Sequence, residues 1–296
     1  MNKSMNYRIY GIVGIESTLA NWNADFTGSP RTTDDGRIYG SDKAFKYSVR
    51  HLWKMKNKNL LIYKELEISK GKLKPKTLDE KYLGQHKKIE DSKSLLTNLF
   101  NYIDVKNFGV AFAVKTWNVS ITGAVQVAQG FNILSDRIID QEILSPFASA
   151  EEKGQSTKGI NGVAEHCLYV YPLVINPGAY NEYVELGVTD GYTEDDYNEF
   201  KYAVNYGATM LNSASKVGCK NSFSVYIKTN KDKYLPPLDK YVEASEEGNS
   251  LNITISISQI LDKDDEVELY YNNLKDTINI DVQCSKFNII TGEIIE

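Results

Sequence analysis

Two stretches of this chain have the periodicity of amphipathic helices, and runs with strand character flank each of them. The first helix is predicted to begin at Ser41, a good N-cap, with Asp42 in the first turn, where negative charge suits the helix dipole. Its apolar residues between 44 and 55 fall on one arc at about 100° per residue. The second helix is predicted over 192–210, where Thr193 is the cap and acidic residues follow it. The order of these helices and of the strands around them decides the fold class.

Runs rich in β-branched and aromatic residues occupy much of the chain outside the two helices. The strands are predicted at 7–15, 108–114, 166–175, 223–229, 253–260 and 266–271. In the run 108–114 bulky and small residues alternate, which predicts a central strand with one packing face and one face for close approach. The order is strand, helix, strands, strand, helix, strand, which is the split βαβ pattern of ferredoxin-like domains. The sequence therefore predicts an α+β fold.

Two segments interrupt this pattern, and we interpret both as insertions into a single domain that spans 1–296. The segment 57–105 is rich in lysine and is predicted to contain a strand at 60–68, a flexible loop at 70–84 and a helix at 92–103. The segment 135–165 is polar, contains glycines and lies between two strong strand runs. A hairpin arm that projects from the domain is the natural interpretation of the second segment.

The charge of the chain is unevenly distributed. The formal net charge is −5, which argues against a generic nucleic-acid binder. The segment 37–93, however, holds 16 Lys and Arg against 7 Asp and Glu, a net charge of +9, whereas the remainder carries −14. Such asymmetry favours a cationic surface for a polyanion, and the alternative is a lysine-rich insertion that is simply solvated.

The first predicted helix concentrates this positive charge on one face. Lys43, Lys46, Arg50 and Lys54 cluster opposite the apolar arc, within about 80° of one another. No carboxylate lies among them, and no Glu–Lys pair at i,i+4 spacing is available to neutralise the face. The preceding segment 16–40 has no clear period and is long for a structureless connection, which is typical of functional or disordered loops.

Motifs of enzyme active sites are missing from the sequence. It has no phosphate-binding GxxxxGK or GxGxxG, and no HExxH, GxSxG or CxxC. His166 adjoins Cys167 in a predicted strand, where successive side chains point to opposite faces, so the two would not meet. We therefore expect no cofactor, no metal site and no catalytic group, and we interpret His166 as structural.

Cysteine usage and hydropathy indicate where the chain acts. Three cysteines lie far apart, at 167, 219 and 284, which fits reduced thiols and no disulfide framework. The sequence begins without a signal peptide, and no apolar run approaches the ~20 residues that span a bilayer. We expect a cytoplasmic protein without a membrane partner.

Four motifs in a particular order carry a family resemblance. A strand leads into NWNADFTGSPR at 21–31 and then GRIYGSDKAFKYSVR at 36–50, and much later FGVAFAV at 108–114 precedes SITGAVQ at 120–126. This arrangement resembles the CRISPR-associated Cas seven (Cas7) family, the backbone subunits of Cascade, and is most similar to the type I-B group. The likeness covers most of the chain, and its specific parts lie at 21–54 and 108–130.

The resemblance implies a modified RNA-recognition-motif fold shaped like a hand. The ferredoxin-like core would be the palm, the insertion 57–105 the fingers and the insertion 135–165 the thumb. It also implies a non-catalytic subunit that forms a helical filament with further copies of itself along the guide part of a CRISPR RNA. Other Cascade subunits would be partners, and target DNA would be reached by way of the guide RNA.

The resemblance also implies which residues bind RNA. Phosphate contacts suit guide RNAs of varying sequence, because such contacts carry no sequence information. The expected RNA-binding residues are Lys43, Lys46, Arg50, Lys54, Arg31, Arg37, Asn23, Thr122 and Gln126. In the thumb, Ile160 and Val163 are expected to wedge against bases.

Two other interpretations of the sequence stay open. Asp25, Asp34 and Asp35 precede the basic helix, and a carboxylate near bound RNA can position a metal or orient a 2′-hydroxyl for cleavage. This would make the chain a type III-like backbone subunit with metal-dependent target-RNA endonuclease activity, although Asp beside Gly is also ordinary turn chemistry. The other alternative is an unrelated globular protein with a basic insertion.

Overall fold

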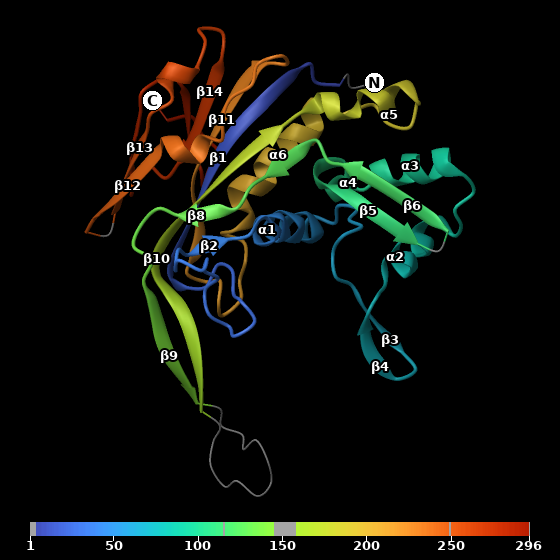
Figure 1. Ribbon diagram of the computed structural model, residues 1–296, viewed down its shortest axis with the longest axis horizontal. Coiled ribbons are helices and arrows are strands. Elements are labelled where there is room, and N and C mark those ends of the chain that lie inside the picture. Colours follow the sequence, from blue (N-terminus) through green and yellow to red (C-terminus); the bar gives the residue numbers. More distant parts are fainter. Residues whose placement is uncertain (1–3, 115, 145–157, 249, 296) are drawn as a thin grey trace, which may run out of the picture.

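The computed structural model describes residues 4–114, 116–144, 158–248 and 250–295, and within them a nine-stranded sheet forms the centre of the molecule (Figure 1). The long strands β1 (Tyr7–Ala20), β10 (Lys158–Ile175) and β11 (Cys219–Asn230) make up its middle, with β1 antiparallel to both neighbours. Beside β11 lie β14 (Glu266–Tyr271) and β16 (Ser285–Asn288). Beside β10 lie β7 (Val125–Val127), β8 (Gly130–Asn132), β9 (Ile138–Leu144) and, next to β8, β2 (Tyr39–Gly40).

Two helices pack against one face of this sheet and against each other. These are α1 (Asp42–Met55) and α6 (Glu194–Gly207), and the side chains of Ser41 and Thr193 cap them as predicted. Phe45 of α1 packs on Tyr171 of β10, and Tyr197 of α6 packs edge-on against Tyr226 of β11. Before α6, the chain forms η1 (Pro177–Tyr180) and α5 (Asn181–Glu185). The larger hydrophobic core lies on this side of the sheet.

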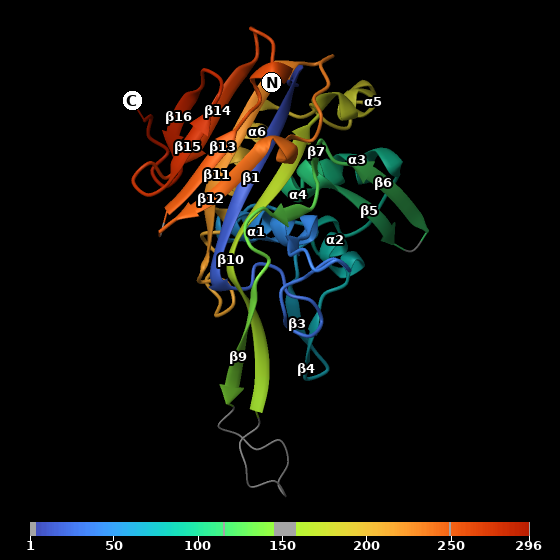
Figure 2. The same cartoon turned by 60° about the vertical axis from the view of Figure 1, so that its left-hand side comes forward.

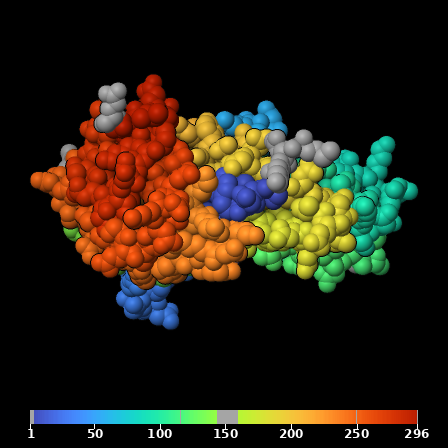
Figure 3. Space-filling model, turned by 90° about the horizontal axis from the view of Figure 1, so that it is seen from above, coloured from blue at the N-terminus to red at the C-terminus, as the bar shows by residue number. Residues whose placement is uncertain are grey.

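A second, smaller sheet covers the opposite face of the central sheet. It consists of β12 (Val242–Glu247), β13 (Ser250–Ile255) and β15 (Thr277–Ile280), with η2 (Leu238–Tyr241) and η3 (Ser258–Ile260) beside it. The strand predicted at 253–260 therefore ends at Ile255, where the chain turns. Figure 3 shows these C-terminal elements gathered at one end of the molecule. A second apolar cluster fills the space between the two sheets, so the central sheet is buried on both faces.

A lateral body, which we define as residues 59–122, lies beside the helices (Figure 2). It contains β3 (Leu66–Ser69), β4 (Lys72–Pro75), α2 (Leu78–His86), α3 (Ser92–Phe100), α4 (Ile103–Phe108), β5 (Gly109–Val114) and β6 (Trp117–Thr122). The helix predicted at 92–103 is present as α3, which ends at Phe100. The loop predicted at 70–84 is wrong, since it contains β4 and α2. Of the strand predicted at 60–68, only the part from Leu66 onward is extended.

The prediction of a central strand at 108–114 is also wrong. Among the described residues, the strand β5 pairs with β6 alone, in a two-stranded sheet of the lateral body. Its bulky face is covered within the lateral body, where Phe112 packs edge-on against Tyr82 of α2 with 5.1 Å between the ring centroids. Ala111 and Ala113, on the small face, are exposed. Alternation predicts a strand with one buried face, but it does not say which element covers that face.

A hairpin of β9 and the first part of β10 projects from the central sheet (Figure 1). Its pairs run from Ala164 with Ile138, at the base, to Lys158 with Leu144. It lies in the segment for which the sequence predicts an arm, and residues 145–157 of that arm are outside the described part of the chain.

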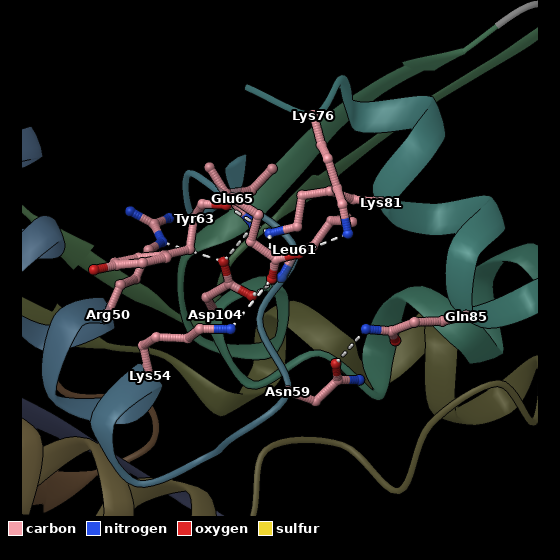
Figure 4. A network of polar contacts seen from close by, with 11 residues as sticks. Arg50, Lys54, Asn59, Leu61, Tyr63, Glu65, Lys76, Lys81, Gln85 and Asp104 are labelled. Atoms are coloured by element: carbon pink, nitrogen blue, oxygen red, sulfur yellow. Dashed lines mark hydrogen bonds and ion pairs between the residues drawn. The ribbon is translucent and has the colours of Figure 1, made fainter. Parts of the chain in front are cut away.

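The carboxylate of Asp104 joins α1 to the lateral body (Figure 4). This side chain is fully buried, at the start of α4. Its Oδ2 lies 3.2 Å from Nε of Arg50 and accepts a hydrogen bond from the backbone N–H of Ile62 (2.8 Å). Its Oδ1 accepts one from the backbone N–H of Leu61 (2.9 Å). One buried carboxylate thus provides the acceptor for the Arg50 side chain of α1 and for the backbone N–H groups at the start of the lateral body.

We predict that Asp104→Ala lowers the free energy of unfolding by about 3–5 kcal/mol, because it leaves the largely buried guanidinium of Arg50 and the N–H groups of Leu61 and Ile62 without this acceptor. Denaturant titration measures this change. The matched control is Glu266→Gln, which breaks the exposed ion pair with Lys228 (3.1 Å). That control is expected to lose less than about 1 kcal/mol. Equal losses for the two variants would contradict the central role of Asp104.

Candidate nucleic-acid interface

The N-terminus of α1 is held by side chains from two other segments. Oδ1 of Asn23 accepts a hydrogen bond from the backbone N–H of Ser41 (2.8 Å), and Oε1 of Gln129 accepts one from Asp42 (3.0 Å). Both use donors of the first turn, which have no partner inside the helix. Asn23, which the resemblance assigns to RNA, therefore has its carbonyl oxygen engaged in positioning the helix. Gln129 was missed, because nothing in its local sequence indicates this contact.

Lys46 and Lys54 of α1 have carboxylate partners, although none was expected on this face. Nζ of Lys46 lies 3.1 Å from Asp42, one turn earlier, and Nζ of Lys54 lies 3.3 Å from Glu65 of the lateral body. The expectation of a face without carboxylates is thus wrong. The N-terminal acid is itself an i,i+4 partner, and Glu65 reaches the helix only through the tertiary fold.

Arg50 is the clearest departure from the expected row of phosphate contacts. Its side chain is only 13% exposed and lies against Asp104, with its guanidinium 5.0 Å from the ring centroid of Phe108. This geometry gives Arg50 a structural role rather than a place on the surface. Lys43, by contrast, is exposed, and no ion pair to it is found among the described residues.

Glu65 draws several lysines together at the entry to the lateral body (Figure 4). Besides Lys54, it lies 3.4 Å from Nζ of Lys76 and 3.6 Å from Nζ of Lys81. Partial burial acts to raise the pKa of Glu65, but the neighbouring lysines outweigh it and lower the pKa. The cationic excess of this segment is therefore partly balanced within the fold.

The loop between β1 and α1 is ordered by its own side chains. Oδ1 of Asp25 accepts hydrogen bonds from the hydroxyl (2.7 Å) and N–H (2.8 Å) of Thr27 and from the N–H of Ser29 (3.1 Å). These hydrogen bonds lower the pKa of Asp25, and the bond from the Thr27 hydroxyl has the largest effect. Asp35 likewise accepts a hydrogen bond from the hydroxyl of Thr33, which lowers its pKa. Both aspartates thus act as turn formers, whereas no hydrogen bond to the Asp34 side chain is found in the part of the chain that the structure describes.

The same loop is attached to the base of the projecting hairpin. Asn21 is buried, and its Nδ2 donates to the carbonyl oxygens of Gly28 (2.9 Å) and Gly162 (3.3 Å). A Cβ atom on Gly162 would come within 2.7 Å of Oγ of Ser29. The loop, the start of α1 and the hairpin therefore meet at one place.

Two arginines of the loop lie at this junction. The backbone N–H of Arg31 donates to the carbonyl of Asn23, and its carbonyl accepts from Tyr39, so Arg31 lies next to the start of α1. Its Nε is buried and has no hydrogen-bond partner among the described residues. Arg37 is exposed, with its guanidinium 4.6 Å from the ring centroid of Phe131. A buried donor without an acceptor is energetically costly.

The buried side chains of Trp22 and Tyr171 form the packed layer beneath this junction. Nε1 of Trp22 donates to the hydroxyl of Tyr171 (2.6 Å). Gly40 and Gly130 face each other across β2 and β8 and make room for the Tyr171 ring. A Cβ atom would come within 1.8 Å of the Tyr171 hydroxyl at Gly40 and within 2.4 Å of the ring at Gly130.

The family model for CRISPR-associated protein Cas7 matches residues 7–265. The chain belongs to the Cas7 family. No curated protein matches the sequence.

Solved structures give weaker similarities. One is a chain of a CRISPR RNA-guided surveillance complex in a pre-nicking state, with 14% identity and a TM-score of 0.49, covering 77% of this chain and 80% of that one. Another is a chain of a CRISPR RNA-guided surveillance complex, with 15% identity and a TM-score of 0.49, covering 88% of each chain.

Two expected Cas7 contacts lie away from α1. Thr122 is exposed at the end of β6, in the lateral body. Gln126 stands opposite Val174 on the face of the sheet that the C-terminal elements cover. There it borders an apolar cavity of about 300 Å³ with Tyr10 and Pro237, and its Nε2 donates to the carbonyl of Gly123 (2.8 Å). The structure therefore does not bring Gln126 together with the α1 lysines, because side chains alternate along β7.

The two expected thumb residues differ in exposure. Ile160 is 69% exposed on the projecting hairpin, whereas Val163 is only 3% exposed at its base. The low exposure of Val163, where the hairpin joins the sheet, does not favour the expected wedge against bases.

The groups weighed for catalysis have structural partners in this Cas7 chain. Cys167 is buried in the helix-side core, and burial raises its thiol pKa to about 12. His166 instead lies 3.2 Å from Glu16 and hydrogen-bonds to Glu246, and the Glu16 contact above all raises its pKa. Among the described residues no group of His, Cys, Asp and Glu suited to a metal is found, and no helix is long and apolar enough to cross a membrane.

We predict that Gly40→Ala destabilises the fold by about 1–3 kcal/mol or more, because the added methyl group overlaps Tyr171. The control is Gly84→Ala in α2, where no atom lies within 4 Å of the added Cβ. That change is expected to stabilise the fold by about 0.5–1 kcal/mol. Thermal or denaturant unfolding measures both, and a Gly40→Ala variant as stable as the parent would refute the packing argument.

Proposed function

We propose that this chain is a non-catalytic, CRISPR RNA-binding backbone subunit of a type I-B Cascade complex that acts in the cytoplasm. The observation that carries the proposal is the junction of Arg31, Arg37 and Lys43 between the loop, α1 and the base of the hairpin. Family membership supplies the ligand class, and a cationic surface supplies affinity for phosphates. Further copies of this chain, other Cascade subunits and target DNA paired with the guide RNA are the proposed partners.

In this proposal the palm is a modified RNA-recognition-motif domain. The strand order β11-β1-β10-β8, with α1 and α6 on one face, agrees with a split βαβ core. The lateral body takes the place of the fingers, beyond the expected limits of 57–105, and the hairpin of β9 and β10 that of the thumb. The face of the central sheet opposite α1 and α6 is buried under the C-terminal strands. RNA cannot lie on that face, so the proposed RNA path follows the loop and α1.

Phosphate contacts suit this task because guide sequences vary. The proposed primary phosphate contacts are Lys43, Arg31 and Arg37. In the complex, Lys46 turns partly from Asp42 to an RNA phosphate, and Lys54 turns partly from Glu65 in the same way. Asn23 acts by holding the start of α1. Thr122 and Ile160, which are exposed on the lateral body and the hairpin, remain proposed contacts. Arg50 contributes through the fold.

We predict that RNA of defined length co-purifies with the chain when it is expressed with a CRISPR array, and that Lys43→Ala with Arg37→Ala reduces the amount retained. The loss is expected to be similar for unrelated guides. The slope of log K against log [salt] is expected to become smaller in magnitude by about 1–2, because two phosphate contacts are removed. The control is Lys240→Ala, which removes another exposed lysine, in η2 and away from α1. Absence of bound RNA, or a loss confined to particular guides, would contradict the proposal.

We predict no regular cutting of complementary RNA by the assembled complex in the presence of Mg²⁺, because Asp25 and Asp35 are occupied by turn hydrogen bonds. Gel analysis of labelled RNA tests this. Asp25→Asn, Asp34→Asn and Asp35→Asn are compared singly with the parent. Cutting at even intervals that one of these changes abolishes would establish the type III-like endonuclease instead.

A further inference from the structure

An exposed aromatic side chain lies within the cationic face of α1. Tyr47 is 49% exposed and falls one turn after Lys43 and two turns before Lys54. At about 100° per residue, all three lie within about 40° of one another. Tyr47 therefore places an aromatic ring on the solvent side of α1, one turn after Lys43 and two turns before Lys54.

The ring of Tyr47 is held by a second aromatic layer. Tyr63 lies nearly parallel to it, with ring centroids 6.0 Å apart and an interplanar angle of 11°. His51, one turn along α1, stacks at 6.0 Å and 26°. The hydroxyl of Tyr63 is 2.9 Å from Nδ1 of His51, which ties this layer to the helix. Burial raises the pKa of Tyr63 to about 12.

The backbone under this layer is fixed by the same joint that connects α1 to the lateral body. Asp104 accepts hydrogen bonds from the N–H groups of Leu61 and Ile62, immediately before Tyr63. Nζ of Lys81 donates to the carbonyl of Tyr63 (2.6 Å). A contact surface built on such a support loses little conformational freedom when a ligand binds.

We propose that Tyr47 is a stacking subsite for one base of the bound single-stranded RNA, flanked by phosphate contacts at Lys43 and Lys54. This rests on the proposed function and adds a base contact to it. Stacking on an aromatic ring accepts every base, because each base has a π-face, so it is compatible with variable guides. The ring of Tyr47 lies one turn from Lys43 and two turns from Lys54, so a base stacked on it can lie between phosphates that the two lysines contact. An unrelated apolar partner would have no need of the lysines.

The test measures binding of the full chain to a short oligouridine and to the same oligonucleotide with abasic riboses, for parent, Tyr47→Ala and Tyr47→Phe. Tyr47→Ala is expected to weaken oligouridine binding about tenfold, in line with measured base–aromatic stacking, whereas Tyr47→Phe changes it less than about twofold. With abasic RNA the parent and Tyr47→Ala are expected to bind equally.

The matched control is Tyr202→Ala, a tyrosine of α6 that is 40% exposed and also packs on a neighbouring ring, that of Tyr206 at 4.7 Å. If Tyr47→Ala behaves like Tyr202→Ala while Lys43→Ala still weakens binding, the stacking subsite is refuted and the RNA-binding function stands. If Tyr47→Ala weakens abasic and normal RNA alike, stacking is also refuted. If the parent binds no RNA, both proposals fail.

Discussion

The buried ion pair of Arg50 and Asp104 is the contact on which the candidate interface depends. It anchors the middle of α1 to the lateral body, and the same carboxylate fixes the backbone at Leu61 and Ile62. Tyr63 and Glu65 follow within three residues and lie beside Tyr47 and Lys54 of the helix. One buried acid therefore sets the position of aromatic and charged groups that come from two distant parts of the chain.

Closure of both faces of the central sheet determines where a nucleic acid can lie. On one side α1 and α6 fill the larger core, and on the other the C-terminal strands cover Ile12, Val170 and Val225. The polar surface at the end of the sheet remains, where the loop after β1, the start of α1 and the hairpin converge. Asn21 and Asn23 make this convergence rigid, because each side chain bridges two segments.

Local patterns predicted the elements that depend on local physics. The caps at Ser41 and Thr193 and the limits of β14 at 266–271 agree with the structure, since capping and alternation act within a few residues. Family membership, which the motif order in the sequence indicated, is confirmed. Contacts across the fold were beyond reach: Asp104 lies 54 residues from Arg50, so the burial of that cation left no local signal. The same holds for Val163 and Gln126, whose faces are decided by the register of β10 with its neighbours.

Ultraviolet crosslinking of the co-purified RNA, followed by mass spectrometry of the crosslinked peptides, tests the central claim most directly. If RNA lies along the loop and α1, crosslinks will be concentrated in peptides from 21–54, with Tyr47 among the modified residues. Crosslinks confined to the C-terminal sheet, at 242–280, with none between 21 and 54, would contradict the account.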